Sequence, residues 1–111
     1  MNNFLVIEEF EKLIADFFNA PYAVATDCCT HAIELCLRYE RYDNILIPEH
    51  TYISIPFTAE KLNLKWNWNK NYQWRDYYYL GNTNIIDAAF LWEKNSYISE
   101  TYMCISFQFR K

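Results

Sequence analysis

Glycine is almost absent from this chain, which has a single one, Gly81, among its 111 residues. An average domain of this length carries roughly seven or eight glycines. Because glycine lets a backbone turn tightly and approach a ligand closely, tight loops that cradle phosphate groups are scarce in this sequence.

Long apolar runs and basic leader segments are also missing. Glu8, Glu9 and Glu11 come soon after Met1, without a basic stretch or a long apolar run before them. We therefore expect neither a signal peptide nor a membrane-spanning segment, and we interpret the chain as a cytoplasmic protein that has no membrane partner.

Concentrated positive charge is lacking as well. The net charge is −4, and Lys65, Lys70 and Arg75 form no dense basic patch. Proteins bind nucleic-acid backbones through clustered lysine and arginine side chains, so we expect no nucleic-acid partner. The aromatic residues between positions 66 and 79 are of types that favour strands.

The four cysteines do not have the pattern of a disulfide framework or of a metal site. In a cytoplasmic protein Cys28, Cys29, Cys36 and Cys104 are expected to be reduced thiols. Cys28 and Cys29 are adjacent, without the two-residue spacer of redox and zinc motifs. We therefore predict no metal site.

Apolar and aromatic residues are what the chain has in abundance. Hydrophobic residues make up 52% of the sequence and aromatic residues 20%, which is enough to form a core in a chain of this length. The sequence contains no linker or repeat that would divide it, so we expect residues 1–111 to belong to a single domain.

Helical and strand patterns alternate along the chain. The spacing of apolar residues predicts helices over residues 10–18, from Thr30 onward and over 51–62, and strands over 22–25, 44–48, 64–68, 85–87 and 102–107. Such alternation favours an α/β fold of three layers, a mainly parallel sheet with flanking helices, which binds ligands beyond the carboxyl ends of its strands. The segment 67–83 fits either a polar loop or an edge strand.

Four short segments hold residues with candidate chemical roles. They are Thr26-Asp27-Cys28-Cys29-Thr30-His31-Ala32-Ile33, Pro48-Glu49-His50-Thr51-Tyr52, Asn84-Ile85-Ile86-Asp87-Ala88-Ala89, and the end of the chain with Ser106 and Lys111. Each has an ordinary structural explanation: Thr30 as a helix N-cap, Tyr52 as core packing, Asp87 as a turn residue and Lys111 as a solvated terminus.

In this order the segments resemble the amino-terminal part of the DegT/DnrJ/StrS family, sugar aminotransferases that use pyridoxal 5'-phosphate and have the aspartate-aminotransferase-like fold. The resemblance covers residues 10–111. It implies that residues 1–111 are a partial domain, the amino-terminal part of the cofactor-binding large domain. The stretch between Tyr52 and Asp87 is shorter than in the family by roughly one strand-helix-strand unit of about 30 residues.

The resemblance also implies a set of cofactor-binding residues. Cys29 and Thr30 would hold the phosphate group at the start of a helix, and Tyr52 would stack on the cofactor ring. Asp87 would pair with the protonated ring nitrogen. In the family the first turn reads Ser-Gly-Thr-Ala-Ala, so Cys29 stands where the family has glycine.

Two further roles fall near the end of the chain. Ser106 would donate a hydrogen bond to the phosphate group, and Lys111 would form the Schiff base with the cofactor and shuttle the proton in catalysis. Two further departures from the family pattern are Ile86 in place of glutamate and Phe90 in place of glutamine or histidine.

The function implied by the resemblance is transfer of an amino group from a donor, glutamate, to a nucleotide-linked keto-sugar in sugar or polysaccharide biosynthesis. The full-length enzyme would be a homodimer, and we expect this chain, as a fragment, to be inactive alone. An alternative is a non-catalytic remnant that acts as an α/β interaction or regulatory module. A third is a small redox protein that uses Cys28 at a helix start.

Overall fold

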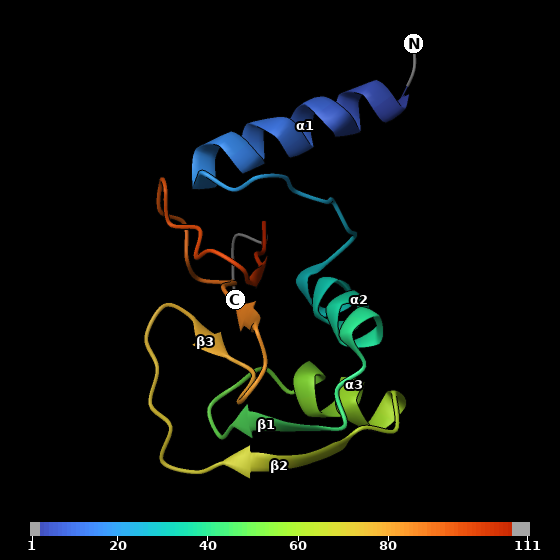
Figure 1. Cartoon of the computed structure of the whole chain (residues 1–111), viewed down its shortest axis with the longest axis vertical. Coiled ribbons are helices and arrows are strands. Elements are labelled where there is room, and N and C mark those ends of the chain that lie inside the picture. The colour runs from blue at the N-terminus through green and yellow to red at the C-terminus, as the bar shows by residue number, and fades with distance from the viewer. Residues whose placement is uncertain (1–2, 108–111) are drawn as a thin grey trace.

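The structure is a computed structural model that describes residues 3–107. The elements are α1 (Asn3–Phe18), α2 (Cys29–Glu40), β1 (Asn44–Pro48), α3 (Ser54–Lys61), β2 (Lys65–Asn69), β3 (Tyr78–Tyr79), β4 (Ile85–Asp87) and β5 (Tyr102–Cys104). Helices and strands alternate from α2 to β2, after the helix α1 and before three short strands (Figure 1). The mixture of helices and strands agrees with an α/β fold.

The strands form two small sheets. β1 and β2 pair in parallel, from Asn44 opposite Lys65 to Pro48 opposite Asn69. β4 pairs in parallel with β5 and antiparallel with β3. The described residues therefore do not show the single three-layer, mainly parallel sheet that we expected. β3, β4 and β5 are only two or three residues long, which limits each of them to a short ladder of hydrogen bonds.

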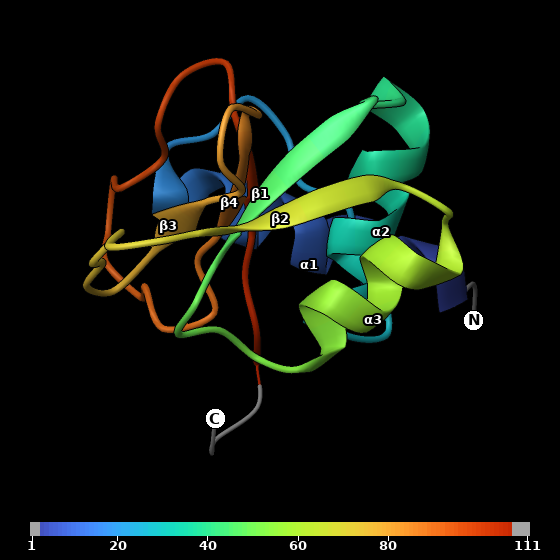
Figure 2. The ribbon, with the colours of Figure 1, turned by 90° about the horizontal axis from the view of Figure 1, so that it is seen from below.

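One buried cluster joins the two sheets to α2 and α3. The spacing of its members along the chain matches the element in which they lie. Ile33 and Leu37 are one helical turn apart, and Ile45 and Ile47 are two residues apart on one face of a strand. Other members are Ile55, Ala59, Tyr78, Leu80, Ile85 and Cys104. Figure 2 shows α2 and α3 side by side next to the β1–β2 pair.

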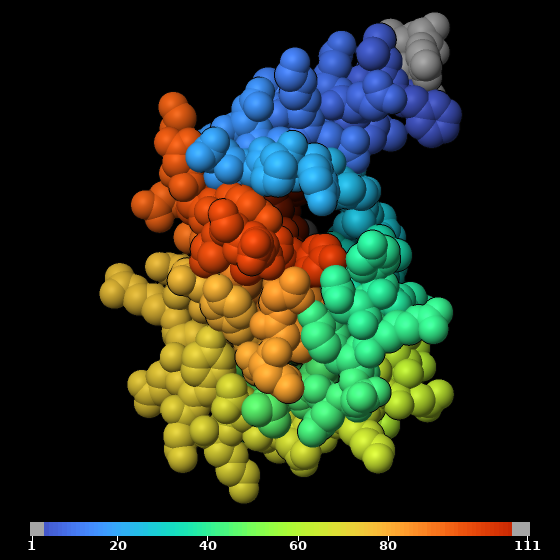
Figure 3. Space-filling model, in the orientation of Figure 1, coloured from blue at the N-terminus to red at the C-terminus, as the bar shows by residue number. Residues whose placement is uncertain are grey.

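Helix α1 extends away from this core. It begins at Asn3, seven residues before the start of the helix that we predicted over residues 10–18. Its last residue is anchored: the Phe18 ring lies 5.4 Å from that of Trp92, and the Phe18 carbonyl accepts a 3.0 Å hydrogen bond from the Tyr97 N–H. Its beginning projects past the rest of the molecule (Figures 1 and 3). In the described part of the chain, no helix has the length and apolar character that crossing a membrane requires.

The strand that we predicted over residues 22–25 is wrong. This segment is an extended connection between α1 and α2 outside any sheet, and the side chains of Tyr22 and Val24 are 77% and 73% exposed. The Ala25 N–H donates a 2.7 Å hydrogen bond to the carboxylate of Glu11 instead of to a neighbouring strand. A short apolar run becomes a strand only where another strand lies beside it, and local pattern does not specify that neighbour.

Candidate functional site

A cavity of about 370 Å³ lies where α2 and α3 begin and β4 ends. Its volume is within the range of small-molecule sites, roughly 300–1,000 Å³. Four of the six cofactor-binding residues that we predicted line this cavity, although they are far apart in the sequence: Cys29, Thr30, Tyr52 and Asp87.

Two helix starts meet at the cavity wall. Thr30 is the second residue of α2, and Ser54 is the first residue of α3. Their hydroxyl oxygens lie 3.0 Å apart and share a hydrogen bond. The first backbone N–H groups of a helix have no partner within the helix and form its positive end. The wall therefore combines two hydroxyl groups with the positive ends of two helices, a combination that suits an anion.

The carboxylate of Asp87 is held at another part of the wall. The residue is 8% exposed, and its two oxygens accept different hydrogen bonds. Oδ2 accepts one of 2.7 Å from the Tyr78 hydroxyl, and Oδ1 accepts one of 3.1 Å from the Ala89 N–H. These two hydrogen bonds fix the position of the carboxylate, which can then offer negative charge to a ligand.

Thr51 extends this arrangement into a chain of three side chains. Its hydroxyl is hydrogen-bonded to that of Tyr78. Burial and the nearby Asp87 charge raise the pKa of Tyr78, so its phenol keeps its proton. Because that single proton is donated to Asp87, Tyr78 accepts from Thr51, and the chain runs from Thr51 through Tyr78 to Asp87.

Aromatic rings cover a further side of the cavity. The Trp74 ring lies 4.7 Å from the Tyr78 ring and 6.5 Å from the Phe90 ring, nearly parallel to the latter. The indole N–H of Trp74 donates a 2.7 Å hydrogen bond to the His50 carbonyl, which fixes the ring in place. Tyr52 lines the cavity with a side chain that is 57% exposed. Flat surfaces for a planar ligand are therefore present.

The model of the DegT/DnrJ/EryC1/StrS aminotransferase family matches residues 4–66, more than half of the chain. The chain belongs to this aminotransferase family. The family that we predicted from the motifs is thus confirmed. The match spans α1, α2, β1 and α3 and includes Thr30 and Tyr52, whereas Asp87 lies beyond it. No curated protein and no solved structure matches the chain.

Cys29, which stands where the family motif has glycine, is accommodated at the helix start. Cys29 is the first residue of α2, preceded by an N-cap, Cys28, in an extended conformation with φ −161° and ψ 164°. The Cys29 thiol is buried and donates a 3.5 Å hydrogen bond to the Cys104 carbonyl. A helical residue needs no positive φ, so this turn does not require glycine. Thr30 is not the N-cap; that position belongs to Cys28.

The two remaining predicted residues, Ser106 and Lys111, come from the end of the chain. Ser106 is buried, and its carbonyl accepts a 2.8 Å hydrogen bond from the Trp92 indole, but the residue does not line the cavity. Lys111 lies outside the described residues. Ile86, which replaces the family's glutamate, is fully buried in a second apolar cluster with Ala88 and Leu91.

Sequence reasoning missed several residues of the site. Ser54 and Trp74 belong to no recognised motif, and Tyr78 lies in the segment 67–83, whose pattern fits either a polar loop or an edge strand. Thr51 belongs to the Pro-x-x-Thr-aromatic motif that pointed to Tyr52, so the motif itself was the signal that could have identified it.

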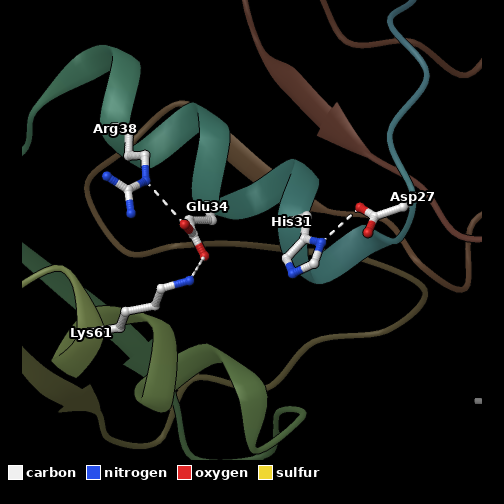
Figure 4. A network of polar contacts seen from close by, with 5 residues as sticks. All are labelled: Asp27, His31, Glu34, Arg38 and Lys61. Atoms are coloured by element: carbon white, nitrogen blue, oxygen red, sulfur yellow. Dashed lines mark hydrogen bonds and ion pairs between the residues drawn. The ribbon is translucent and has the colours of Figure 1, made fainter.

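A polar network holds α2 against α3 (Figure 4). Glu34 on α2 accepts 3.0 Å hydrogen bonds from Arg38 on its own helix and from Lys61 on α3. The hydrogen bonds from Lys61 and Arg38 lower the pKa of the Glu34 carboxyl. This bridge joins the middle of α2 to the last residue of α3.

Another contact lies at the start of α2. Nδ1 of His31 and Oδ1 of Asp27 are 2.7 Å apart (Figure 4). With Cys28 these residues bring one potential ligand atom each to within 4.8 Å of one another, all on exposed side chains. The sequence pattern did not identify this group of three side chains.

Proposed function

We propose that this chain forms the cofactor-binding part of a pyridoxal 5'-phosphate-dependent aminotransferase that acts on nucleotide-linked keto-sugars, with glutamate as the amino donor. Membership of the aminotransferase family supports the reaction class. The observation that carries the cofactor assignment is the convergence of Thr30, Tyr52 and Asp87 on one cavity.

The groups along the cavity wall suit the chemistry of that cofactor. Its phosphate group matches the two helix starts with the hydroxyls of Thr30 and Ser54. Its protonated ring nitrogen matches the buried carboxylate of Asp87, and its flat ring matches the exposed face of Tyr52. When bound, the cofactor supplies an electron sink for amino-group chemistry.

The protein's own residues then have separate tasks. Tyr78 orients the Asp87 carboxylate and, with its pKa raised, remains a hydrogen-bond donor. We assign the phosphate group to Thr30 and Ser54, since Ser106 does not line the cavity. Lys111 is proposed to attach the cofactor covalently, for which its amine must be neutral.

We further propose that the protein works as a homodimer in an enzyme of the aspartate-aminotransferase-like fold. An unusually apolar surface on α1 supports association. Its exposed side chains include Phe4 at 72%, Leu5 at 53%, Val6 at 55% and Leu13 at 68%. Apolar surface concentrated on one projecting helix is typical of protein interfaces.

A second candidate function is a non-catalytic interaction module. The same exposed surface of α1 supports it, and so do the short strands of the β3–β4–β5 sheet. The two candidates differ in one measurable property, because only the aminotransferase requires the cavity to bind pyridoxal phosphate.

The test is a titration of the purified full chain with pyridoxal 5'-phosphate, followed by tryptophan fluorescence, in parallel with pyridoxal, which lacks the phosphate group. We expect saturable binding of the phosphorylated form and weakening of about tenfold or more in Asp87→Asn, because a charged hydrogen-bonded contact is worth roughly 1.5–3 kcal/mol. Asp43→Asn is the matched control, since Asp43 is exposed and outside the cavity lining.

The covalent role of Lys111 is checked on the same samples by borohydride reduction and peptide mass spectrometry. The cofactor should be found on Lys111, and Lys111→Ala should abolish the labelled peptide, whereas Lys94→Ala at an exposed position should not. A folded wild-type protein that binds neither pyridoxal nor its phosphate would reject the aminotransferase and favour the interaction module.

A further inference from the structure

Two cysteines on different elements touch each other close to the cavity. Sγ of Cys36 on α2 and Sγ of Cys104 at the end of β5 are 3.9 Å apart, although the residues are 68 positions apart in the sequence. Both are free thiols. Cys36 is partly exposed, and Cys104 is 4% exposed. A disulfide has its sulfurs about 2.05 Å apart, so the two sulfurs must approach each other by about 1.9 Å to form a bond.

Cys104 is also bonded to the part of the chain that forms the site. Its carbonyl accepts a 2.8 Å hydrogen bond from the Ala88 N–H and a 3.5 Å hydrogen bond from the Cys29 thiol. In the parallel register of β4 and β5, Cys104 is the partner of Asp87. A covalent link from Cys36 to Cys104 would therefore join α2 to the strand beside the Asp87 carboxylate.

We propose that Cys36 and Cys104 are a reversible dithiol–disulfide pair, oxidised by small-molecule disulfides such as oxidised glutathione, and that the disulfide form fixes α2 to β5 beside the cavity. The inference depends only on the contact between the two thiols and on the accessibility of one of them. It stands whether or not the cavity binds pyridoxal phosphate.

The two thiols differ in a way that sets the order of the reaction. The hydrogen bond from the Cys104 thiol lowers the pKa of Cys36, against the opposing effects of burial and of the Glu40 charge. The same hydrogen bond, together with burial, raises the pKa of Cys104. Cys36 is thus both the more accessible and the more acidic thiol, which makes it the attacking nucleophile.

The exchange has two balanced steps. The Cys36 thiolate attacks one sulfur of oxidised glutathione, the glutathione S–S bond breaks, and one glutathione thiolate leaves. Cys104 then attacks the Cys36 sulfur of the mixed disulfide at the 3.9 Å contact, its proton passes to the second departing glutathione thiolate, and the protein disulfide forms. Two protein thiols are oxidised, and one glutathione disulfide is reduced to two thiols.

The experiment treats the full chain, first reduced and then desalted, with oxidised glutathione and analyses it by intact-mass and peptide mass spectrometry. We expect a species about 2 Da lighter than the reduced chain, in which the peptides of Cys36 and Cys104 are linked. Reduction should reverse it. The oxidised form should also melt at least about 5 °C higher, since the bond closes a long loop of the unfolded chain.

Two variants serve as controls. Cys36→Ser should lose the linked species, whereas Cys28→Ser, which removes an exposed thiol elsewhere on the surface, should retain it. If the wild type instead accumulates glutathione adducts without a Cys36–Cys104 link, or links a different pair of cysteines, the proposal is overturned. Because the linked peptide is read in the wild type, the result does not depend on either variant folding.

Discussion

The hydroxyl of Tyr78 donates a 2.7 Å hydrogen bond to Oδ2 of Asp87 across the antiparallel pair of β3 and β4. Both residues are buried, and they occupy directly opposed positions in the register. The bond gives the carboxylate a fixed donor at the edge of the cavity. It also links two strands that are only two and three residues long.

Replacing Tyr78 with phenylalanine should destabilise the protein by about 1–3 kcal/mol, because a buried carboxylate oxygen loses its donor while the ring packing is kept. Urea unfolding at neutral pH measures this difference. Tyr22→Phe is the control, because Tyr22 is 77% exposed. Equal stability of Tyr78→Phe and wild type would show that the bond contributes nothing to folding.

The bridge from α2 to α3 should make stability depend on pH in the acid range. Hydrogen bonds from Lys61 and Arg38 lower the pKa of Glu34 in the folded state below its ordinary value of 4.5. The unfolded state therefore takes up the proton first, so the stabilisation is fully present above about pH 5 and is lost as pH falls through the lowered pKa.

Glu34→Gln tests this dependence through the melting temperature as a function of pH. The variant should melt below wild type at about pH 7, and the two curves should converge as the pH falls through the lowered pKa of Glu34, where the wild-type carboxyl becomes neutral. Glu93→Gln, at an exposed position, should follow wild type throughout. A gap between Glu34→Gln and wild type that stays constant down to acid pH would exclude a charge-based bridge.

Gly81, the one glycine, should not tolerate a side chain. Its φ is +55°, and a Cβ added there would lie 2.5 Å from Cβ and 2.9 Å from the backbone nitrogen of Leu46 on β1. Gly81→Ala should therefore cost more than about 1 kcal/mol, through both the strained φ and the close approach.

The neighbouring Asn82 offers a matched control for that substitution. Asn82 is exposed and is not among the residues with positive φ, so Asn82→Ala should remain close to wild type in denaturant unfolding. The effect of Gly81→Ala should extend to the site, because the turn it belongs to sets Tyr78 opposite Asp87. A Gly81→Ala protein as stable as Asn82→Ala would contradict the prediction.

Local pattern predicted several elements well. The strand over residues 44–48 is β1, and the strand over 85–87 is β4, both with the predicted bounds. These segments are apolar runs that end at Pro48 and Asp87, so neighbouring residues suffice to recognise them. The segment 22–25 has a similar apolar pattern but lies outside both sheets, because its conformation depends on whether a strand lies beside it.

The candidate site likewise contains residues that the sequence identifies and residues that only the structure identifies. Thr30, Tyr52 and Asp87 were recognised from motifs, because each lies in a short segment with several matching residue types. Ser54 and Tyr78 were not, because their importance comes from contacts with Thr30 and Asp87 that no local motif encodes.

By itself, the sequence determined the family and the mixture of helices and strands. It also determined which residue types are available to contact the anionic group, the flat ring and the positive charge of a ligand. The tertiary structure decided which side chains meet: Tyr78 with Asp87, and Cys36 with Cys104. It also decided that the strands form two small sheets. The physical reason is that helix and strand periodicity follows from neighbouring residues, whereas these contacts arise only when segments distant in the chain pack together and exclude water.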